Sequence, residues 1–258
     1  MVEMSVSVII PAFNEAQRLP LTLRATVDYF AARPESFDLL VVDDGSTDGT
    51  AQVVEEFARQ NPDIPIHCLG YGGNRGKGYA VRYGMLRADG DLRLFCDADL
   101  ATPAEEYEVV RAAMEREGMP IGIGSRPLRN SHLLVHQPWY REWLGRSFNK
   151  AVQVLAVPGI ADTQCGFKVF TAEAATDVFS RCRLDGFAFD SEALYVARRL
   201  GYAIAEVPIR WSHKEGSKVS MVRDGLKMLR DLSLIRWMHR HLQRTNSSPP
   251  APAAHPKA

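Results

Sequence analysis

The 258-residue chain has little cysteine, and its four cysteines lie far apart with no Cys-x-x-Cys pair. This spacing argues against a zinc site and against the disulfide framework of a small secreted domain. The four are Cys68, Cys96, Cys165 and Cys182. We therefore expect a protein of a reducing compartment.

Long apolar runs and an excess of charge are also missing. No uninterrupted apolar stretch approaches the roughly 18 residues that a membrane-spanning helix needs, and the start, Met-Val-Glu-Met, lacks the features of a secretion signal. The 31 Lys and Arg balance the 31 Asp and Glu, so bulk charge gives no argument for a nucleic-acid partner. These absences predict a cytoplasmic protein, or one that contacts the cytoplasmic face of a membrane only peripherally.

The chain does contain a regular alternation of short apolar strands with amphipathic helices. Hydrophobic residues make up 46% of the sequence, which is enough for a sizeable core. The order predicts an α/β fold: one Rossmann-like domain with a doubly wound, mostly parallel sheet, whose ligands bind beyond the carboxyl ends of the strands. The expected strands are residues 6–10, 39–42, 64–69, 92–96 and 121–124, and the expected helices are 15–32, 50–60, 77–88 and 103–116.

The second half of the chain alternates less regularly. Its expected elements are a helix near 138–156, a strand near 165–170, a helix after Asp190 and extended chain over 203–211.

The last helical stretch, about 219–244, mixes apolar and basic side chains. A basic amphipathic helix can lie in an anionic membrane interface, and it can equally pack its apolar face on the domain. Both can hold at once, whereas the spacing of the charges excludes a membrane span. We expect one domain over 1–244, followed by a disordered Pro- and Ala-rich tail over 245–258.

The most informative motif is the pair Asp97 and Asp99, which follows an apolar segment. On extended chain, residues two apart point to the same side, so both carboxylates can bind one hard divalent cation. Mg²⁺ is typically held by one or two carboxylates while substrate phosphates and water complete its shell. The pair therefore suggests a phosphate-bearing substrate; the alternative is that these residues cap the next helix.

Two polar loops follow the first two expected strands. Residues 11–15 read Pro-Ala-Phe-Asn-Glu, and residues 43–50 begin with Asp43 and Asp44. Turn chemistry explains the later part of the second loop. It explains less well why two carboxylates close a hydrophobic strand, where one could accept a hydrogen bond from a base or a ribose hydroxyl.

A third loop, residues 74–78, is rich in glycine and contains Lys77. It does not have the Walker A spacing of a phosphate-binding loop, which removes the main support for a kinase. A basic turn that opens a helix still offers N–H groups and charge to an anion. The alternative is a tight loop with a solvated lysine.

In this order the motifs resemble the inverting glycosyltransferases of family 2, which have the GT-A fold and use a nucleotide-sugar donor. The second half looks most like the dolichyl-phosphate β-glucosyltransferases, a group of polyprenyl-phosphate glycosyltransferases, through residues 162–170, 187–192 and 215–218. The resemblance spans about residues 5–240. It implies Mg²⁺- or Mn²⁺-dependent transfer of a hexose to a polyprenyl (dolichyl-type) phosphate, with UDP-glucose as the expected donor and GDP-mannose as another. Ala101 stands where related mannosyl enzymes carry Gln, which counts against a mannose synthase.

The resemblance also implies site residues. The nucleotide sugar would contact Pro11, Phe13, Glu15, Val41, Asp43, Asp44, Lys77, Asp97, Ala98 and Asp99, and Asp97 and Asp99 would hold the metal. The acceptor phosphate would contact Arg126, Arg141 and Lys214, and the catalytic groups would be Asp190, Asp162, Arg126 and Lys218. Exposed cations are usually only solvated, and Asp190 could instead be the N-cap of the following helix.

The expected acceptor changes the chemistry that is needed. A lipid monophosphate has a second pKa near ~6, so it is largely ionised at neutral pH and needs no general base. Catalysis then consists of alignment and of neutralising the departing diphosphate with a metal and cations. Two alternatives stay open: a hydroxyl acceptor on a soluble or cell-envelope glycan, and a nucleotide-sugar-binding protein without turnover.

Overall fold

The computed structural model describes residues 4–128, 132–135, 157–212 and 221–242, with only the backbone for 132–135 and 221–229. The strands are β1 (Ser5–Ala12), β2 (Ser36–Asp43), β3 (Ile66–Gly70), β4 (Leu92–Cys96), β5 (Ile121–Ser125), β6 (His132–Val135), β7 (Phe167–Thr171), β8 (Ile204–Pro208) and β9 (Arg210–Ser212). The helices are α1 (Leu19–Ala31), α2 (Thr50–Gln60), α3 (Lys77–Met85), α4 (Glu106–Glu117), α6 (Ala172–Phe179), α7 (Phe189–Leu200) and α8 (Met221–Met238).

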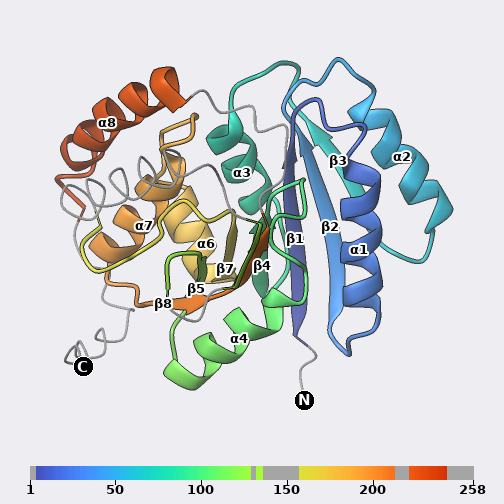
Figure 1. Cartoon of the computed structure of the whole chain (residues 1–258), viewed down its shortest axis with the longest axis horizontal. Helices are drawn as coiled ribbons and strands as arrows, with labels where there is room; N and C mark the ends of the chain where they lie inside the picture. Colours follow the sequence, from blue (N-terminus) through green and yellow to red (C-terminus); the bar gives the residue numbers. More distant parts are fainter. Residues whose placement is uncertain (1–3, 129–131, 136–156, 213–220, 243–258) are drawn as a thin grey trace.

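Seven of these strands form one sheet in the order β3-β2-β1-β4-β7-β5-β8 (Figure 1). The pairs among β1, β2, β3 and β4 are parallel, as is β5 with β8. Strand β7 is antiparallel to both of its neighbours. The sheet thus confirms the predicted α/β fold with a mostly parallel sheet.

Both faces of the sheet are covered, because successive side chains of a strand point to opposite sides. Along β1, Val8 and Ile10 pack with buried residues of α1, α2 and α4, whereas Ile9 packs with those of α3, α6 and α7. Strands that are buried on both faces read as continuous apolar runs. This explains why the first strands were visible in the sequence as unbroken hydrophobic segments.

The position of β7 brings its amino end to the functional edge of the sheet. Phe167 pairs with Cys96 at the carboxyl end of β4, and Thr171 pairs with Leu92 at the other end. The sequence predicted a strand here but not its direction. An antiparallel strand starts where its parallel neighbours end, so the segment before β7 lies beside the loop that follows β4.

Helix α8 packs on the domain through its inner side. Leu232 and Ile235 are fully buried in the cluster that contains residues of α6 and α7, whereas Trp237 is 64% exposed. Figure 1 shows α8 next to α7, on the opposite side of the domain from α2. Among the described residues, none of the helices combines the length and the apolar character that crossing a membrane requires. The helix expected at 138–156 and the tail at 245–258 lie outside the described residues.

Candidate active site

The Asp44 carboxylate organises the glycine-rich loop after β3. It accepts hydrogen bonds from the Tyr71 hydroxyl (2.7 Å), Asn74 Nδ2 (3.0 Å) and the backbone N–H groups of Arg75 (2.6 Å) and Gly76 (2.8 Å). The side chain is almost completely buried. We expected Asp44 to contact the nucleotide sugar; in this structure both of its oxygens hold the loop instead.

The neighbouring Asp43 lies at the carboxyl end of β2 and is only half-buried. Its Oδ1 accepts from the Ser46 N–H at 2.9 Å. The Ser46 hydroxyl in turn accepts from the Asn14 N–H (2.8 Å), and Asn14 Oδ1 accepts from the Thr47 N–H (2.8 Å). These bonds tie the loop after β1 to the loop after β2, and they place Asp43 at the junction expected to bind the nucleoside.

Four more residues expected at the nucleoside lie around this junction with different exposures. The Glu15 carboxylate accepts from Arg18 Nε and Nη2, both at 2.7 Å. Phe13 is half-buried and Pro11 is buried. Val41 has no exposed surface and packs in the core with residues of α1 and α2. The Val41 side chain therefore packs β2 against α1 and α2.

Asp97 and Asp99 lie where β4 ends, as the motif predicts. Lys77 Nζ forms an ion pair with Asp97 Oδ1 at 2.6 Å, and Asp99 Oδ1 accepts from the Ala101 N–H at 3.0 Å. No other described residue donates to the second oxygen of either carboxylate. Burial and then the charge of Asp97 raise the pKa of Asp99. This concentration of negative charge suits a cation.

Lys77 stands at the amino end of α3, and its ammonium pairs with Asp97. Burial by itself would lower the pKa of Lys77, but the charges of Asp97 and Asp190 outweigh it and the pKa is raised. The ammonium is therefore held charged. It gives the site a positive group that a diphosphate can share.

The approach of Asp97 to the chain before β7 requires a glycine. The Asp97 N–H donates to the Gly166 carbonyl at 3.1 Å. A Cβ on Gly166 would lie 2.1 Å from Asp97 Oδ2, far inside van der Waals contact. The absence of a side chain at Gly166 thus allows the Asp97 carboxylate to lie against the backbone just before β7.

Arg126, which follows β5, is held by Asp162. Arg126 Nε and Nη2 donate to the two oxygens of this carboxylate at 2.6 and 2.9 Å, and the Arg126 N–H donates at 3.1 Å. The Arg126 guanidinium also lies 5.6 Å from the centre of the Trp211 ring. Burial alone would raise the pKa of Asp162, but Arg126 more than offsets this and the pKa is lowered. Asp162 therefore positions Arg126, because both oxygens of its ionised carboxylate accept hydrogen bonds from the guanidinium.

Glu206 on β8 fixes Asp162 in turn. Its carboxylate accepts from the N–H groups of Ala161 (2.9 Å) and Asp162 (2.8 Å). Sequence reasoning did not single out Glu206. The signal was present, since a carboxylate in the middle of an apolar strand implies a partner.

Asp190 and Lys168 form a buried ion pair behind Asp97. Lys168 Nζ contacts Asp190 Oδ1 and also donates to the Cys165 carbonyl at 2.5 Å. Burial raises the pKa of Asp190, while Lys168 and Lys77 oppose the rise. The N-cap of α7 is Ala188, so the interpretation of Asp190 as an N-cap is wrong. Lys168 was not assigned a role, although a lysine between Phe167 and Val169 in an apolar strand signalled a buried partner.

Three expected cationic residues, Arg141, Lys214 and Lys218, lie outside the described residues. Within the described part of the chain, no group of three or more His, Cys, Asp and Glu side chains is arranged to hold a metal ion. The Asp97 and Asp99 pair nevertheless fits a hard cation whose remaining ligands come from a bound diphosphate and water. Burial raises the pKa of the Cys96 thiol and raises that of Cys165 to about 12, which keeps both thiols protonated.

Comparison with protein families gives a match to the model described as "Glycosyl transferase family 2" over residues 7–179. Among curated proteins, the chain is 37% identical over 242 residues to a dolichyl-phosphate beta-glucosyltransferase of Dictyostelium discoideum, covering 90% of this chain and 74% of that protein. The human protein of that name is 35% identical over 240 residues, covering 89% and 74%. The protein of that name from Saccharomyces cerevisiae is 32% identical over 252 residues, covering 92% and 75%.

Two solved structures share the fold at lower identity. Mannosyl-3-phosphoglycerate synthase from Rubrobacter xylanophilus superimposes with a TM-score of 0.67 at 20% identity, covering 95% of this chain and 79% of that one. Glucosyl-3-phosphoglycerate synthase from Mycobacterium tuberculosis, in complex with Mn²⁺, UDP and glucosyl-3-phosphoglycerate, gives 0.63 at 19% identity, covering 95% and 82%.

Proposed function

The chain belongs to glycosyl transferase family 2, and from this premise we propose that it transfers glucose from UDP-glucose to a polyprenyl phosphate of the dolichyl type. The relatives named as dolichyl-phosphate beta-glucosyltransferases support this choice, since the match covers about nine-tenths of the chain. The observation that carries the proposal is the arrangement of Asp97, Asp99 and Lys77 at the carboxyl end of β4. It offers carboxylates for a cation and an ammonium for a diphosphate at one place.

We propose Mg²⁺ or Mn²⁺ as the cation, held by Asp97 and Asp99 against the donor diphosphate. When bound, the ion neutralises charge that develops on the leaving diphosphate. The raised pKa of Asp99 supports the assignment, because burial and the neighbouring Asp97 disfavour its negative charge while no cation is bound. The fold is shared with a protein solved with Mn²⁺ and UDP.

The donor would lie across the carboxyl ends of β1, β2 and β4. Asp43, at the junction of the first two loops, would accept from the uracil base or the ribose. Lys77 would face the diphosphate with its ammonium from the amino end of α3. Asp44 would act on the donor indirectly, by holding the loop that leads into this helix.

The acceptor would be the ionised phosphate of the lipid. One of its oxygens attacks C1 of glucose, the bond from C1 to the diphosphate oxygen breaks with inversion, and UDP leaves. Arg126 is the described cation best placed to hold this phosphate, because Asp162 fixes its guanidinium beside the site. We propose Arg141, Lys214 and Lys218 as further cations for phosphate groups. Asp190 would act by orienting Lys168 and Lys77 rather than by removing a proton.

A lipid-linked acceptor requires the enzyme to work at a membrane surface. We propose that the exposed end of α8 makes this contact, with Trp237 at the boundary and basic residues toward the lipid. The inner side of the same helix is packed on the domain through Leu232 and Ile235. Packing and membrane contact therefore use different sides of one helix.

One transfer assay tests the proposal. The protein is incubated with labelled UDP-glucose, GDP-mannose or UDP-GlcNAc, with and without polyprenyl phosphate, and the products are extracted into organic solvent. We expect label in the organic phase only with UDP-glucose and the lipid phosphate together. Transfer from UDP-glucose to an added glycan, with no extractable label, would replace the lipid by a hydroxyl acceptor. Donor binding without transfer or hydrolysis would contradict an enzyme.

A further inference from the structure

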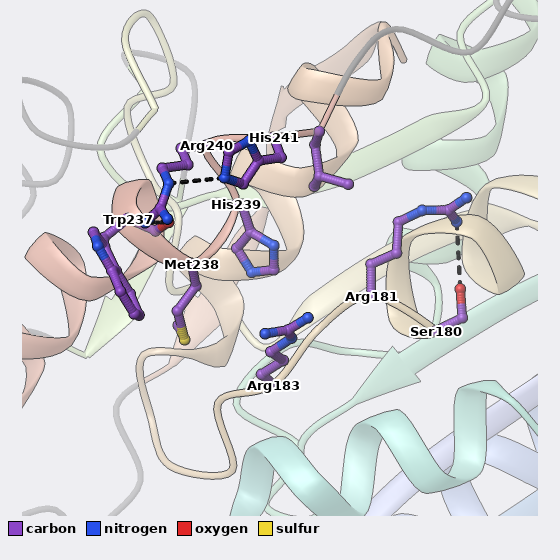
Figure 2. A pocket seen from close by; sticks show the side chains of 9 residues that line it. Ser180, Arg181, Arg183, Trp237, Met238, His239, Arg240 and His241 are labelled. Carbon is purple, nitrogen blue, oxygen red and sulfur yellow. Dashed lines mark hydrogen bonds between the residues drawn. The ribbon is translucent and has the colours of Figure 1, made fainter.

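A cavity lies apart from the Asp97 and Asp99 site, between the end of α8 and the turn that follows α6. Its volume is about 480 Å³. Figure 2 shows Trp237 and Arg240 on one side of the opening and Arg181 and Arg183 on the other. The lining residues are Ser180, Arg181, Arg183, Trp237, Met238, His239, Arg240, His241 and Leu242. Three arginines and two histidines thus converge on one cavity.

The nearest carboxylates are occupied within the protein. Glu192 lies beneath the cavity with no exposed surface; it accepts from the N–H groups of Arg183 (2.9 Å) and Leu184 (2.8 Å) and contacts His239 Nε2 at 2.7 Å. Asp185, two residues after Arg183, pairs with Arg82 Nη2 at 2.6 Å. Asp177 is a further described carboxylate of this region. It accepts from the Tyr202 hydroxyl at 2.8 Å and from Arg181 Nη1 at 3.2 Å. These described carboxylates therefore already have partners within the protein.

Arg183 and Arg240 are the two exposed arginines of the lining. Arg240 Nε donates to His241 Nε2 at 2.9 Å, and its guanidinium lies 4.9 Å from the centre of the Trp237 ring. No described carboxylate forms an ion pair with either arginine. The cavity can thus present two charged groups to an incoming anion.

The apolar part of the lining decides what kind of anion fits. Among the side chains that the structure describes, Trp237 is the most exposed large hydrophobic one outside the first helix, and Met238 lines the cavity beside it. A site for a small dissolved anion does not need an exposed indole at its rim. Trp at the level of lipid headgroups, with cations next to it, is the composition of a membrane-interface element.

We propose that this cavity binds the phosphate of an anionic phospholipid headgroup and so docks the end of α8 on a bilayer. The inference rests on the proposed function only in that a lipid-linked acceptor requires docking; the binding itself involves neither donor nor acceptor. Arg183 and Arg240 hold the phosphate, and Trp237 inserts at the headgroup level. The turn that carries Arg183 continues to Asp185, whose carbonyl accepts from the Gly78 N–H at 2.8 Å. The docked surface is thus joined to the helix that begins with Lys77.

Vesicle co-sedimentation of the full chain tests this inference. The vesicles contain phosphatidylcholine alone or with one third phosphatidylserine, and no donor or polyprenyl phosphate is added. The variant is Arg183→Gln/Arg240→Gln, and the matched control is Arg59→Gln/Arg116→Gln, which removes two exposed charges from α2 and α4. Each cation near an anionic surface contributes roughly fivefold in affinity, so the cavity variant should bind about 25-fold more weakly. The control should bind like the wild type, and Trp237→Ala should also weaken binding.

Equal sedimentation of the cavity variant and the control, with both folded by circular dichroism, would overturn the proposal. So would wild-type protein that ignores phosphatidylserine at low salt. A parallel arm uses inorganic phosphate: a rise in wild-type Tm that the cavity variant lacks, without vesicle binding, would assign the cavity to a dissolved phosphate instead. Because the assay contains no substrate, its failure would leave the transfer assay unaffected, and failure of the transfer assay would leave vesicle binding unaffected.

Discussion

Lys168 and Asp190 form an ion pair in the interior of the protein, with the Lys168 side chain fully buried and that of Asp190 5% exposed. The pair joins β7 to the first turn of α7, and the charge of Asp190 also acts on Lys77. Two elements that lie about twenty residues apart in the chain are thereby joined near Asp97, whose charge acts on Asp190. The contact lies in the interior, since Lys168 is fully buried and Asp190 is almost so.

Breaking this pair from one side should be costly. Lys168→Met leaves a buried carboxylate without its partner, and we expect a loss of about 3–5 kcal/mol in the free energy of unfolding. The double variant Lys168→Met/Asp190→Leu removes both charges and should recover much of that loss. Urea unfolding of the wild type, of Lys168→Met, of Asp190→Leu and of the double variant measures the coupling energy between the two side chains. Additive losses would show that the two groups are not coupled.

Asp190→Asn tests the chemistry of the acceptor. If the nucleophile is an already ionised phosphate, the variant should slow turnover by less than the ~10²–10⁴-fold typical of a lost general base. Turnover is compared at saturating UDP-glucose, with donor binding and unfolding measured on the same preparation. A loss at the top of that range, with normal donor binding and fold, would favour a hydroxyl acceptor.

Asp99→Asn should abolish most transfer while leaving the fold stable. The variant removes one proposed metal ligand and also removes the repulsion from Asp97 that contributes to the raised pKa of Asp99. Since that pKa is raised, the ionised carboxylate costs stability above it, and the metal-free variant should unfold at the same Tm as the wild type or higher. Asp89→Asn, an exposed change just before the other end of β4, is the control. Full transfer in the presence of a chelator would contradict the metal role.

The ion pair of Arg126 with Asp162 should make stability fall at low pH. The pKa of Asp162 lies below its ordinary value of 3.8, so the contribution is present above that value and is lost as the pH falls through the folded pKa. We expect Asp162→Asn to destabilise the protein by about 3 kcal/mol near pH 7, with the difference from wild type shrinking below about pH 4. Denaturant unfolding at a series of pH values measures this difference. A penalty that stays constant down to pH 2 would show that ionisation of Asp162 is not its source.

Much of the architecture was determined by the sequence itself. Apolar segments that end in Asp, Gly or Pro, separated by amphipathic helices, predict a Rossmann-like sheet because burial on both faces demands that pattern. Asp43, Asp97 and Asp99 come directly at the ends of such apolar segments, so the same pattern predicts them at strand ends. Ligands of such sheets bind at those ends, which made the three residues site candidates. These are local properties, and each can be recognised from its own stretch of chain.

Only the tertiary structure decided how distant residues are partnered. The direction of β7 could not be predicted from the residue pattern, so the contacts of Lys168 with Asp190 and of Gly166 with Asp97 could not be predicted either. The residue pattern also could not distinguish Asp44 from Asp43. Asp44 is buried and accepts hydrogen bonds from the loop after β3, whereas Asp43 next to it is half-buried. In each case the role depends on contacts between segments that the fold brings together, and a one-dimensional pattern of residue types does not contain those distances.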